Sequence, residues 1–480
     1  MKRIFHTLLL ATVFSCASVP EPVSCLDEEA SIWPDYKGVT VPENIAPLNF
    51  SFTGDGEDAV LEVNGSLIKQ SRGGLFRFGK RRWRKWMESD TLTCSVRVLR
   101  DGQWLRLKPF HIYVSRDRMD PYVSYRLIPP GYQGWDRMGI YERHIESYAQ
   151  DAIIDNRLSG GNCLNCHSFP ENNPDKFVFH ARADFGGTFL VDGNQVEKLN
   201  TKTDSTISAL VYPYWHPGGK LIAFSTNRTF QAFYNHGDNR IEVYDEASDI
   251  VLYDTESHGI SWSKLTKSAD AFETFPAFSP DGKYLYFCSA RAVDMPQKYN
   301  EVRYALKRIA FDAGTKSFGD SLETVFDAPA MGKSVSFPRV SPDGRYLCFT
   351  LHDYGNFSIW HQEADLWLLD LETGDARPME RLNSDSVESF HTWSSNGRWL
   401  VFSTRRDDKL HTRLYFSHID ADGRESKPFL LPQKDPAKFY GDLLMSYNLP
   451  QFTTGKVKAG RRGIIKEMRQ SKGTDIKPEI

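Results

Sequence analysis

A recurring turn in the second half of the chain limits its fold more than any other feature. Four segments align, each with a glycine-containing turn, a basic residue and an apolar run: "PYWHPGGKLIAFSTNR" from Pro213, "FPAFSPDGKYLYFCSAR" from Phe275, "FPRVSPDGRYLCFTLH" from Phe337 and "FHTWSSNGRWLVFSTRR" from Phe390. Because glycine supplies the positive φ that such a turn requires, each segment predicts a β-hairpin. Further hairpin signals such as "DLWLLDLETGD" lie between them, so each repeat predicts a four-stranded sheet. Successive four-stranded sheets are typical of a β-propeller.

The turns themselves resemble a known family. Ser-Pro-Asp-Gly followed by Lys or Arg, at 279–283 and 341–345, is similar to the repeat of TolB-type propellers. The resemblance implies an all-β fold with about six four-stranded blades, which we assign to residues 186–445, followed by a C-terminal tail at 446–480. We interpret the Asp-Gly turns as purely architectural.

The region before the repeats predicts a second, smaller β domain. Residues 27–150 contain strand-like runs with period-two alternation, such as "TLTCSVRVL", which predict a β-sandwich-like domain. They also contain the most basic stretch, "RFGKRRWRKWMESD" from Arg77. We interpret it as an amphipathic helix whose Trp83, Trp86 and Met87 pack inward, rather than as an anion-binding or membrane-facing patch.

Charge and the N-terminus narrow the class of protein. The 480 residues carry a formal net charge of −3, so the chain has no overall basic field to bind nucleic acid. A basic start, a short apolar run and Ser15-Cys16 predict an export signal at residues 1–16. Its end resembles a lipoprotein signal, which implies that Cys16 is acylated; the alternative is a plain cleaved signal. We therefore predict a protein of the periplasm or outer membrane, attached to the membrane by lipid.

One motif indicates a cofactor. Cys163, Cys166 and His167 form the only Cys-x-x-Cys-His among 7 cysteines and 13 histidines, a spacing typical of covalent haem c attachment with the histidine as iron ligand. We assign a haem-binding loop segment to residues 151–185. Three alternatives remain: a thioredoxin-like pair, which would need a βαβ context; a structural zinc, which would need a fourth ligand; and a disulfide or free thiols. Cys94, Cys288 and Cys348 are isolated in strand-like runs and predict small buried side chains.

The second axial position of the iron decides the chemistry. His180 follows in "KFVFHARADFGG" and is our first candidate for the opposite haem face, with Met138, His144 and Met331 as rivals. A strong sixth ligand would suit electron transfer, and methionine there would raise the reduction potential. An open iron would favour peroxidase-like or ligand-sensing chemistry.

The full layout resembles exported TolB-like proteins of Bacteroidetes-type bacteria, often labelled as cytochrome-related, which implies a haem-bearing lipoprotein without naming a reaction. We predict a monohaem c-type cytochrome that transfers electrons, with the propeller as a docking platform for a redox partner. The alternatives are a TolB-like binding or assembly module whose haem is structural or sensory, and a haem peroxidase-like enzyme. No Ser-His-Asp signature, Gly-rich phosphate loop or paired-carboxylate motif is recognisable in the sequence.

Overall fold

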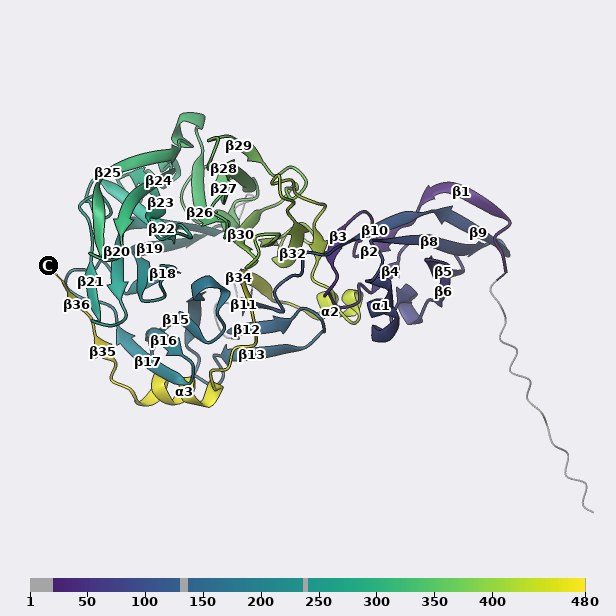
Figure 1. Ribbon diagram of the computed structural model, residues 1–480, viewed down its shortest axis with the longest axis horizontal. Coiled ribbons are helices and arrows are strands. Elements are labelled where there is room, and N and C mark those ends of the chain that lie inside the picture. The colour runs from purple at the N-terminus through teal and green to yellow at the C-terminus, as the bar shows by residue number, and fades with distance from the viewer. Residues whose placement is uncertain (1–19, 130–136, 236–240, 480) are drawn as a thin grey trace, which may run out of the picture.

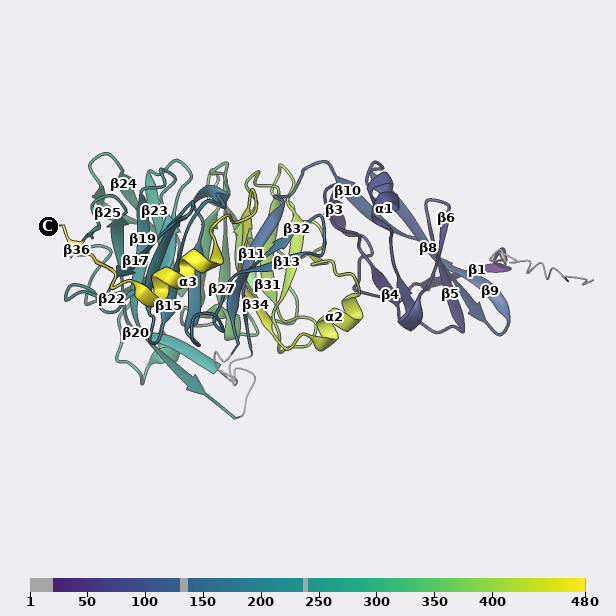
Figure 2. The same cartoon turned by 90° about the horizontal axis from the view of Figure 1, so that it is seen from below.

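A computed structural model describes residues 20–129, 137–235 and 241–479 of the chain. The export signal and Cys16 lie outside these residues. The described chain is built almost entirely of β-strands, which form two bodies that lie side by side, a smaller N-terminal one and a larger ring (Figures 1 and 2). Among the described helices, none is long and apolar enough to cross a membrane.

The N-terminal body contains two sheets that share one hydrophobic core. The larger sheet consists of β1 (Ser24–Glu29), β3 (Thr40–Pro42), β5 (Asp58–Val63), β6 (Ser66–Lys69), β8 (Thr91–Arg100), β9 (Gln103–Lys108) and β10 (Phe110–Ser115). The smaller sheet consists of β2 (Ile32–Trp33), β4 (Phe50–Phe52) and β7 (Leu75–Phe76).

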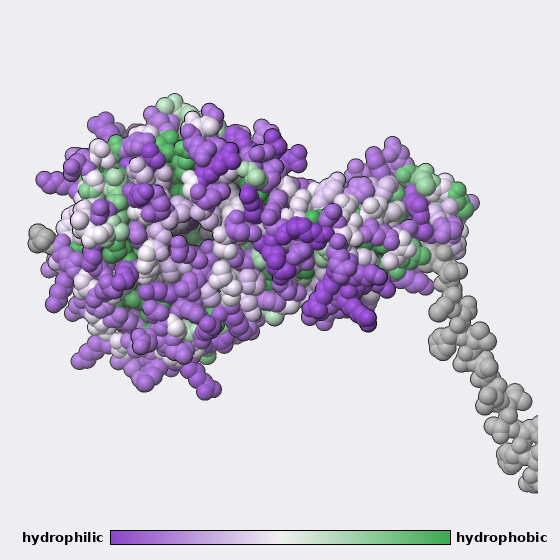
Figure 3. All heavy atoms as spheres, viewed as in Figure 1, coloured by the Kyte–Doolittle hydropathy of each residue, from purple (hydrophilic) through white to green (hydrophobic). Residues whose placement is uncertain are grey.

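The basic stretch forms helix α1 (Lys80–Trp86), as predicted. Trp83, Trp86 and Met87 are buried in the core of the N-terminal body, and the Arg and Lys side chains are exposed. The surface over α1 is strongly hydrophilic in Figure 3. The helix thus covers the core with its aromatic face and keeps its charges in water.

The larger body contains six sheets built on four antiparallel strands each, and two of these sheets gain a fifth, parallel strand from β35 (Thr474–Asp475) and β36 (Lys477–Pro478). Sheet I has β11 (Tyr122–Ile128), β12 (Gly139–His144), β13 (Gln150–Asp155) and β34 (Ser446–Thr453); sheet II has β14 (Cys163–Ser168), β15 (Lys176–Arg182), β16 (Gly187–Asp192) and β17 (Gln195–Asn200). Sheet III has β18 (Leu210–Trp215), β19 (Leu221–Phe233), β20 (Ile241–Asp254) and β21 (Gly259–Ser261); sheet IV has β22 (Ala271–Phe278), β23 (Tyr284–Arg291), β24 (Ala305–Asp312) and β25 (Ser317–Phe326). Sheet V has β26 (Ser334–Val340), β27 (Tyr346–His352), β28 (Asp365–Asp370) and β29 (Ala376–Pro378); sheet VI has β30 (Glu388–Trp393), β31 (Trp399–Thr404), β32 (Arg413–His418) and β33 (Phe429–Leu430).

These sheets form a propeller-like ring. One edge strand of each sheet lies innermost and contacts the innermost strands of the neighbouring sheets, in the cyclic order β34, β14, β18, β22, β26, β30 (Figure 1). Sheet I closes the ring, because β34 from the C-terminal region pairs with β11, at the start of the ring.

The boundaries differ from the predicted ones. The ring begins at β11 rather than at residue 186, since neither sheet I nor sheet II has the succession of glycine-containing turn, basic residue and apolar run that we used to recognise repeats. The region predicted as a tail, 446–480, forms β34, α3 (Arg461–Gln470), β35 (Thr474–Asp475) and β36 (Lys477–Pro478). It is ordered by burial: Ile464 and Met468 of α3 pack into the core beside sheet II.

The segment predicted as a haem-binding loop contains a β-strand instead. Cys163–Ser168 is strand β14, the innermost strand of sheet II, and Leu164 is fully buried in its core. Gly160 and Gly161, both with positive φ, immediately precede the strand. The loop therefore ends at Asn162, and the chain enters strand β14 at Cys163.

The repeated turns have the architectural role that we predicted. In sheet IV, Asp281 Oδ1 accepts hydrogen bonds from the Ser279 hydroxyl at 2.6 Å and from the backbone N–H of Lys283 at 3.1 Å. Sheet V repeats this pattern at Asp343, and sheet VI repeats it with Asn396. The polar side chains of these turns therefore hold the hairpins rather than a ligand.

Candidate functional site

Each innermost strand contains one residue in the left-handed region. These residues are Cys166, Tyr212, Phe275, Phe337, Phe390 and Leu449, with φ between 48° and 53°. The strand pairing shifts register at the same place in all six sheets. A register shift of this kind is a β-bulge, which re-aims a side chain.

We call these six residues the central ring. Their aromatic members meet one another: the ring centroids of Tyr212 and Phe275 are 4.7 Å apart, and those of Phe275 and Phe337 are 4.0 Å apart. Phe337 and Phe390 follow at 4.9 Å. The central ring therefore closes the middle of the propeller-like body with apolar side chains, and Cys166 is one of its six members.

The next position along each innermost strand also follows a pattern. Four sheets have proline there and two have histidine: His167, Pro213, Pro276, Pro338, His391 and Pro450. Proline is tolerated because the backbone N–H at a bulge is free of the strand ladder. The Cys-His pair of the motif thus stands where Phe-Pro stands in sheets IV and V, and the motif is also part of the structural repeat.

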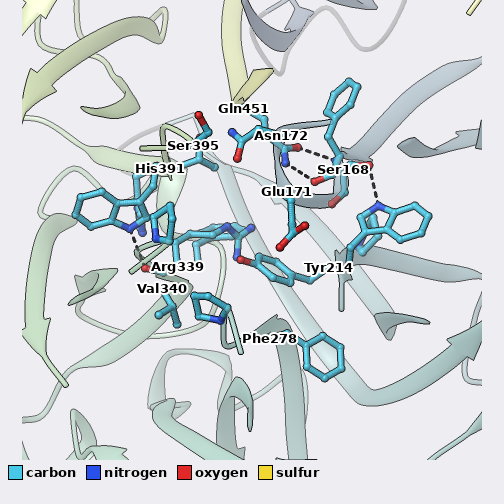
Figure 4. A pocket seen from close by; sticks show the side chains of 18 of the residues that line it. Ser168, Glu171, Asn172, Tyr214, Phe278, Arg339, Val340, His391, Ser395 and Gln451 are labelled. Atoms are coloured by element: carbon cyan, nitrogen blue, oxygen red, sulfur yellow. Dashed lines mark hydrogen bonds between the residues drawn. The ribbon is translucent and has the colours of Figure 1, made fainter. Parts of the chain in front are cut away.

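A cavity of about 250 Å³ lies on one side of the central ring. Residues of all six innermost strands line it, and Phe337, Phe390 and Leu449 of the central ring form its floor. Figure 4 shows Glu171, Tyr214 and Arg339 pointing into this space. Glu171 is exposed, so the cavity reaches the surface there.

His167 is the residue of the motif that faces this cavity. Its side chain is buried, with 7% of the residue exposed, and among the described residues the Leu449 backbone is the one hydrogen-bonding group beside its ring, so one ring nitrogen is left without a partner. Burial, with a smaller contribution from the charge of Arg126, lowers the pKa of His167 to about 3. The imidazole is therefore neutral at physiological pH. One of its nitrogens carries a free lone pair, as an iron or metal ligand requires.

The two cysteines are placed differently from each other. Both are buried, and burial raises the pKa of the Cys166 thiol. Cys166 belongs to the central ring, whereas Cys163 precedes the bulge, and neither thiol is among the described residues that line the cavity. The buried Arg126 guanidinium lies near both thiols and donates to the Asn165 side-chain oxygen.

These residues fit a haem through His167. A buried imidazole with an unpartnered nitrogen beside an aromatic cavity has a lone pair that a haem iron or a water molecule could take up. Cys166 is adjacent to it at the level of the cavity floor. Cys163 would have to reach the porphyrin from beyond that floor, which makes it the less favourably placed of the two attachment points.

The four predicted sixth ligands lie outside the cavity lining. His180 is buried in β15, opposite Asn165 of β14, and its Nδ1 is 3.1 Å from the Thr188 hydroxyl. Met138 is buried, His144 Nδ1 contacts the Ser147 hydroxyl at 3.0 Å, and Met331 is half exposed. Within the described chain, no three His, Cys, Asp or Glu side chains converge on a point that could hold a bare metal ion.

Sequence reasoning missed His391. This histidine lies in the repeat segment that begins at Phe390, and it lines the same cavity as His167. Aligning the Cys-His of the motif with the Phe-His of that segment would have found it.

Comparisons with known proteins identify no family. No family model matches the chain, and no curated protein matches it. Among solved structures, prolyl oligopeptidase B from Galerina marginata is similar at 10% identity and a TM-score of 0.36, over 71% of this chain and 43% of that one. Dipeptidyl peptidase 4 from Porphyromonas gingivalis matches at 11% identity and a TM-score of 0.31, over 61% and 48%.

A third solved structure is covered almost completely. The DUF4784 family protein from Bacteroides caccae matches at 8% identity and a TM-score of 0.29, over 74% of this chain and 95% of that one. This chain spans less than half of the two peptidases. Similarities at this level assign neither a family nor an activity.

Proposed function

We propose that this chain is an exported, lipid-anchored monohaem c-type cytochrome built on a TolB-type propeller, and that it transfers electrons to a protein partner that docks on the propeller. One observation carries the proposal: His167 of the Cys-x-x-Cys-His motif is buried beside the central cavity with one ring nitrogen left unpartnered. A buried nitrogen without a partner costs about 1–3 kcal/mol. A ligand that takes up its lone pair would remove that cost.

The chain's own residues have distinct roles in this proposal. His167 holds the iron, and Cys163 and Cys166 hold the porphyrin through thioether bonds. A bound haem would supply a one-electron couple. The aromatic members of the central ring exclude water from one side, and exposed Glu171 marks the side open to a partner.

A second candidate function rests on the polar groups of the cavity. Arg339 is half-buried, with its guanidinium carbon 5.1 Å from the ring centroid of Tyr214, and Glu171 faces the same space (Figure 4). An aromatic cavity with one cation and one carboxylate suits a small polar ligand. In that case the chain is a TolB-like binding or assembly module, and Cys163, Cys166 and His167 are parts of its wall.

An optical spectrum of the protein made with a cytochrome c maturation system separates the two functions. We expect covalent haem in the wild type and none in Cys163→Ala/Cys166→Ala. The matched control is Cys288→Ala/Cys348→Ala, which removes two equally buried thiols from β23 and β27 and should keep the haem. Absence of covalent haem in the wild type would overturn the cytochrome and leave the binding module.

The spectrum also tests the mode of action. A low-spin haem that is reduced and reoxidised rapidly by small redox dyes supports electron transfer. A haem locked in one oxidation state would indicate a structural or sensory role, and a high-spin iron would favour peroxidase-like chemistry.

A further inference from the structure

A second histidine lines the central cavity, and it has the same repeat position in its own sheet as His167 has in sheet II. His391 in β30 follows Phe390 of the central ring, just as His167 in β14 follows Cys166. Strand β34 lies between β30 and β14 and contacts both. The two histidines therefore stand two sheets apart around the ring and line one cavity.

Their surroundings correspond as well. The backbone of Leu449, the central-ring residue of the preceding sheet, lies beside the ring of His167. The backbone of Phe337, again the central-ring residue of the preceding sheet, lies beside that of His391. The propeller-like repeat thus presents both imidazoles from equivalent backbone positions.

The protonation of His391 follows from its hydrogen bond to Cys348. Its Nε2 lies 2.9 Å from the carbonyl oxygen of Cys348, which only accepts, so the proton is on Nε2. Nδ1 then carries a lone pair, and it has no hydrogen-bond partner although the residue is 1% exposed. Burial lowers the pKa of His391 to about 3, so this tautomer is neutral.

The architecture does not require histidine at this position. Four of the six sheets have proline there, and an unpartnered buried nitrogen is unfavourable by about 1–3 kcal/mol. Two histidines that share this position, this burial and one cavity are better explained by a common ligand than by packing.

We infer that His391 would hold the haem iron together with His167, from the cavity that both residues line. This inference rests on the proposed haem and names its sixth ligand. Among the candidates taken from the sequence, His180 contacts the Thr188 hydroxyl through Nδ1 and does not line the cavity. Met138, His144 and Met331 do not line the cavity either.

The test compares His391→Gln with His180→Gln, both made with the maturation system. Glutamine keeps an N–H that can donate to the Cys348 carbonyl, but its amide is a poor iron ligand. We expect both variants to keep covalent haem at the wild-type level. His391→Gln should change from low-spin to high-spin and regain the low-spin spectrum when imidazole is added, while His180→Gln stays low-spin.

Two results would overturn the inference and keep the cytochrome: a low-spin His391→Gln, or a wild type that is already high-spin. Wild-type protein without covalent haem would overturn the cytochrome itself, and the ligand assignment with it. If His391→Gln fails to fold, His391→Met decides. Because methionine ligation raises the reduction potential, that variant should stay low-spin with a more positive potential, and an unchanged potential would contradict the role of His391.

Discussion

Strands β14 and β26 have the same place in the repeat, but the two residues at the bulge are of different chemical types. Both are innermost strands with one left-handed residue, yet β26 has Phe337 followed by Pro338, where β14 has Cys166 followed by His167. In β26 these two positions serve packing alone. In β14 the same backbone presents a thiol and an imidazole. The difference shows that the bulge fixes where two side chains go, and that the fold accepts reactive residues there.

The largest expected effect concerns the central ring. Phe337→Ala should destabilise the unloaded protein by about 3–5 kcal/mol, because it removes a buried aromatic ring that packs between Phe275 and Phe390. Cys166→Ala removes one sulfur at the equivalent position and should cost about 1 kcal/mol. Denaturant unfolding of the haem-free proteins measures both. Equal losses of stability in the two variants would contradict the argument that the size of the side chain removed from the central ring sets the loss.

A smaller effect concerns the pH dependence of stability. Burial depresses the pKa of His167 to about 3 in the folded chain, whereas an unfolded histidine has a pKa of about 6.5. The stability that this neutral imidazole contributes is therefore present above pH 6.5 and is lost as the pH falls toward 3. In that window one such group changes the free energy of unfolding by about 1.4 kcal/mol per pH unit.

In the haem-free protein, the variant His167→Leu should reduce the slope of the free energy of unfolding against pH by the contribution of one histidine. Pro338→Ala is the matched control, since it changes the same repeat position in sheet V and removes no titrating group. Denaturant midpoints between pH 7 and pH 4 give the slopes. An unchanged slope in His167→Leu would contradict the burial of a neutral imidazole at that position.

The smallest effect concerns the turn after β26, which β14 lacks. Asp343 Oδ1 accepts from the Ser341 hydroxyl at 2.5 Å and from the Arg345 N–H at 3.1 Å. Asp343→Ala should cost about 1 kcal/mol, the contribution of a typical hydrogen bond. Asp343→Asn should cost a few tenths, because Asn396 makes the same contacts in sheet VI. Thermal unfolding separates the two variants, and equal losses would show that the carboxylate charge matters.

The sequence predicted the part of the ring in which local chemistry dictates structure. Glycine with positive φ at Gly282 and Gly344, beside an aspartate that caps the turn, specifies a hairpin whatever surrounds it. Sheet I could not be predicted in this way. Its inner strand β34 pairs with β11, more than three hundred residues earlier in the chain, so tertiary contact decides that pairing.

The candidate site was predicted in part for a related reason. Cys163, Cys166 and His167 form a local motif, visible without any fold. The importance of His391 depends on its register within the ring, since only the closed arrangement brings β30 and β14 to one cavity. His180 is near His167 along the chain, but its strand position directs its Nδ1 to Thr188.

The closing strand has a consequence for the order of assembly. A polypeptide is made from its N-terminus, so β14 and β30 are made before β34, which lies between them. Until residues 446–453 are made, the cavity that the two imidazoles line has only five of its six innermost strands. The cavity therefore reaches its final form only when the C-terminal strand β34 pairs with β11, one of the first strands of the ring to be made.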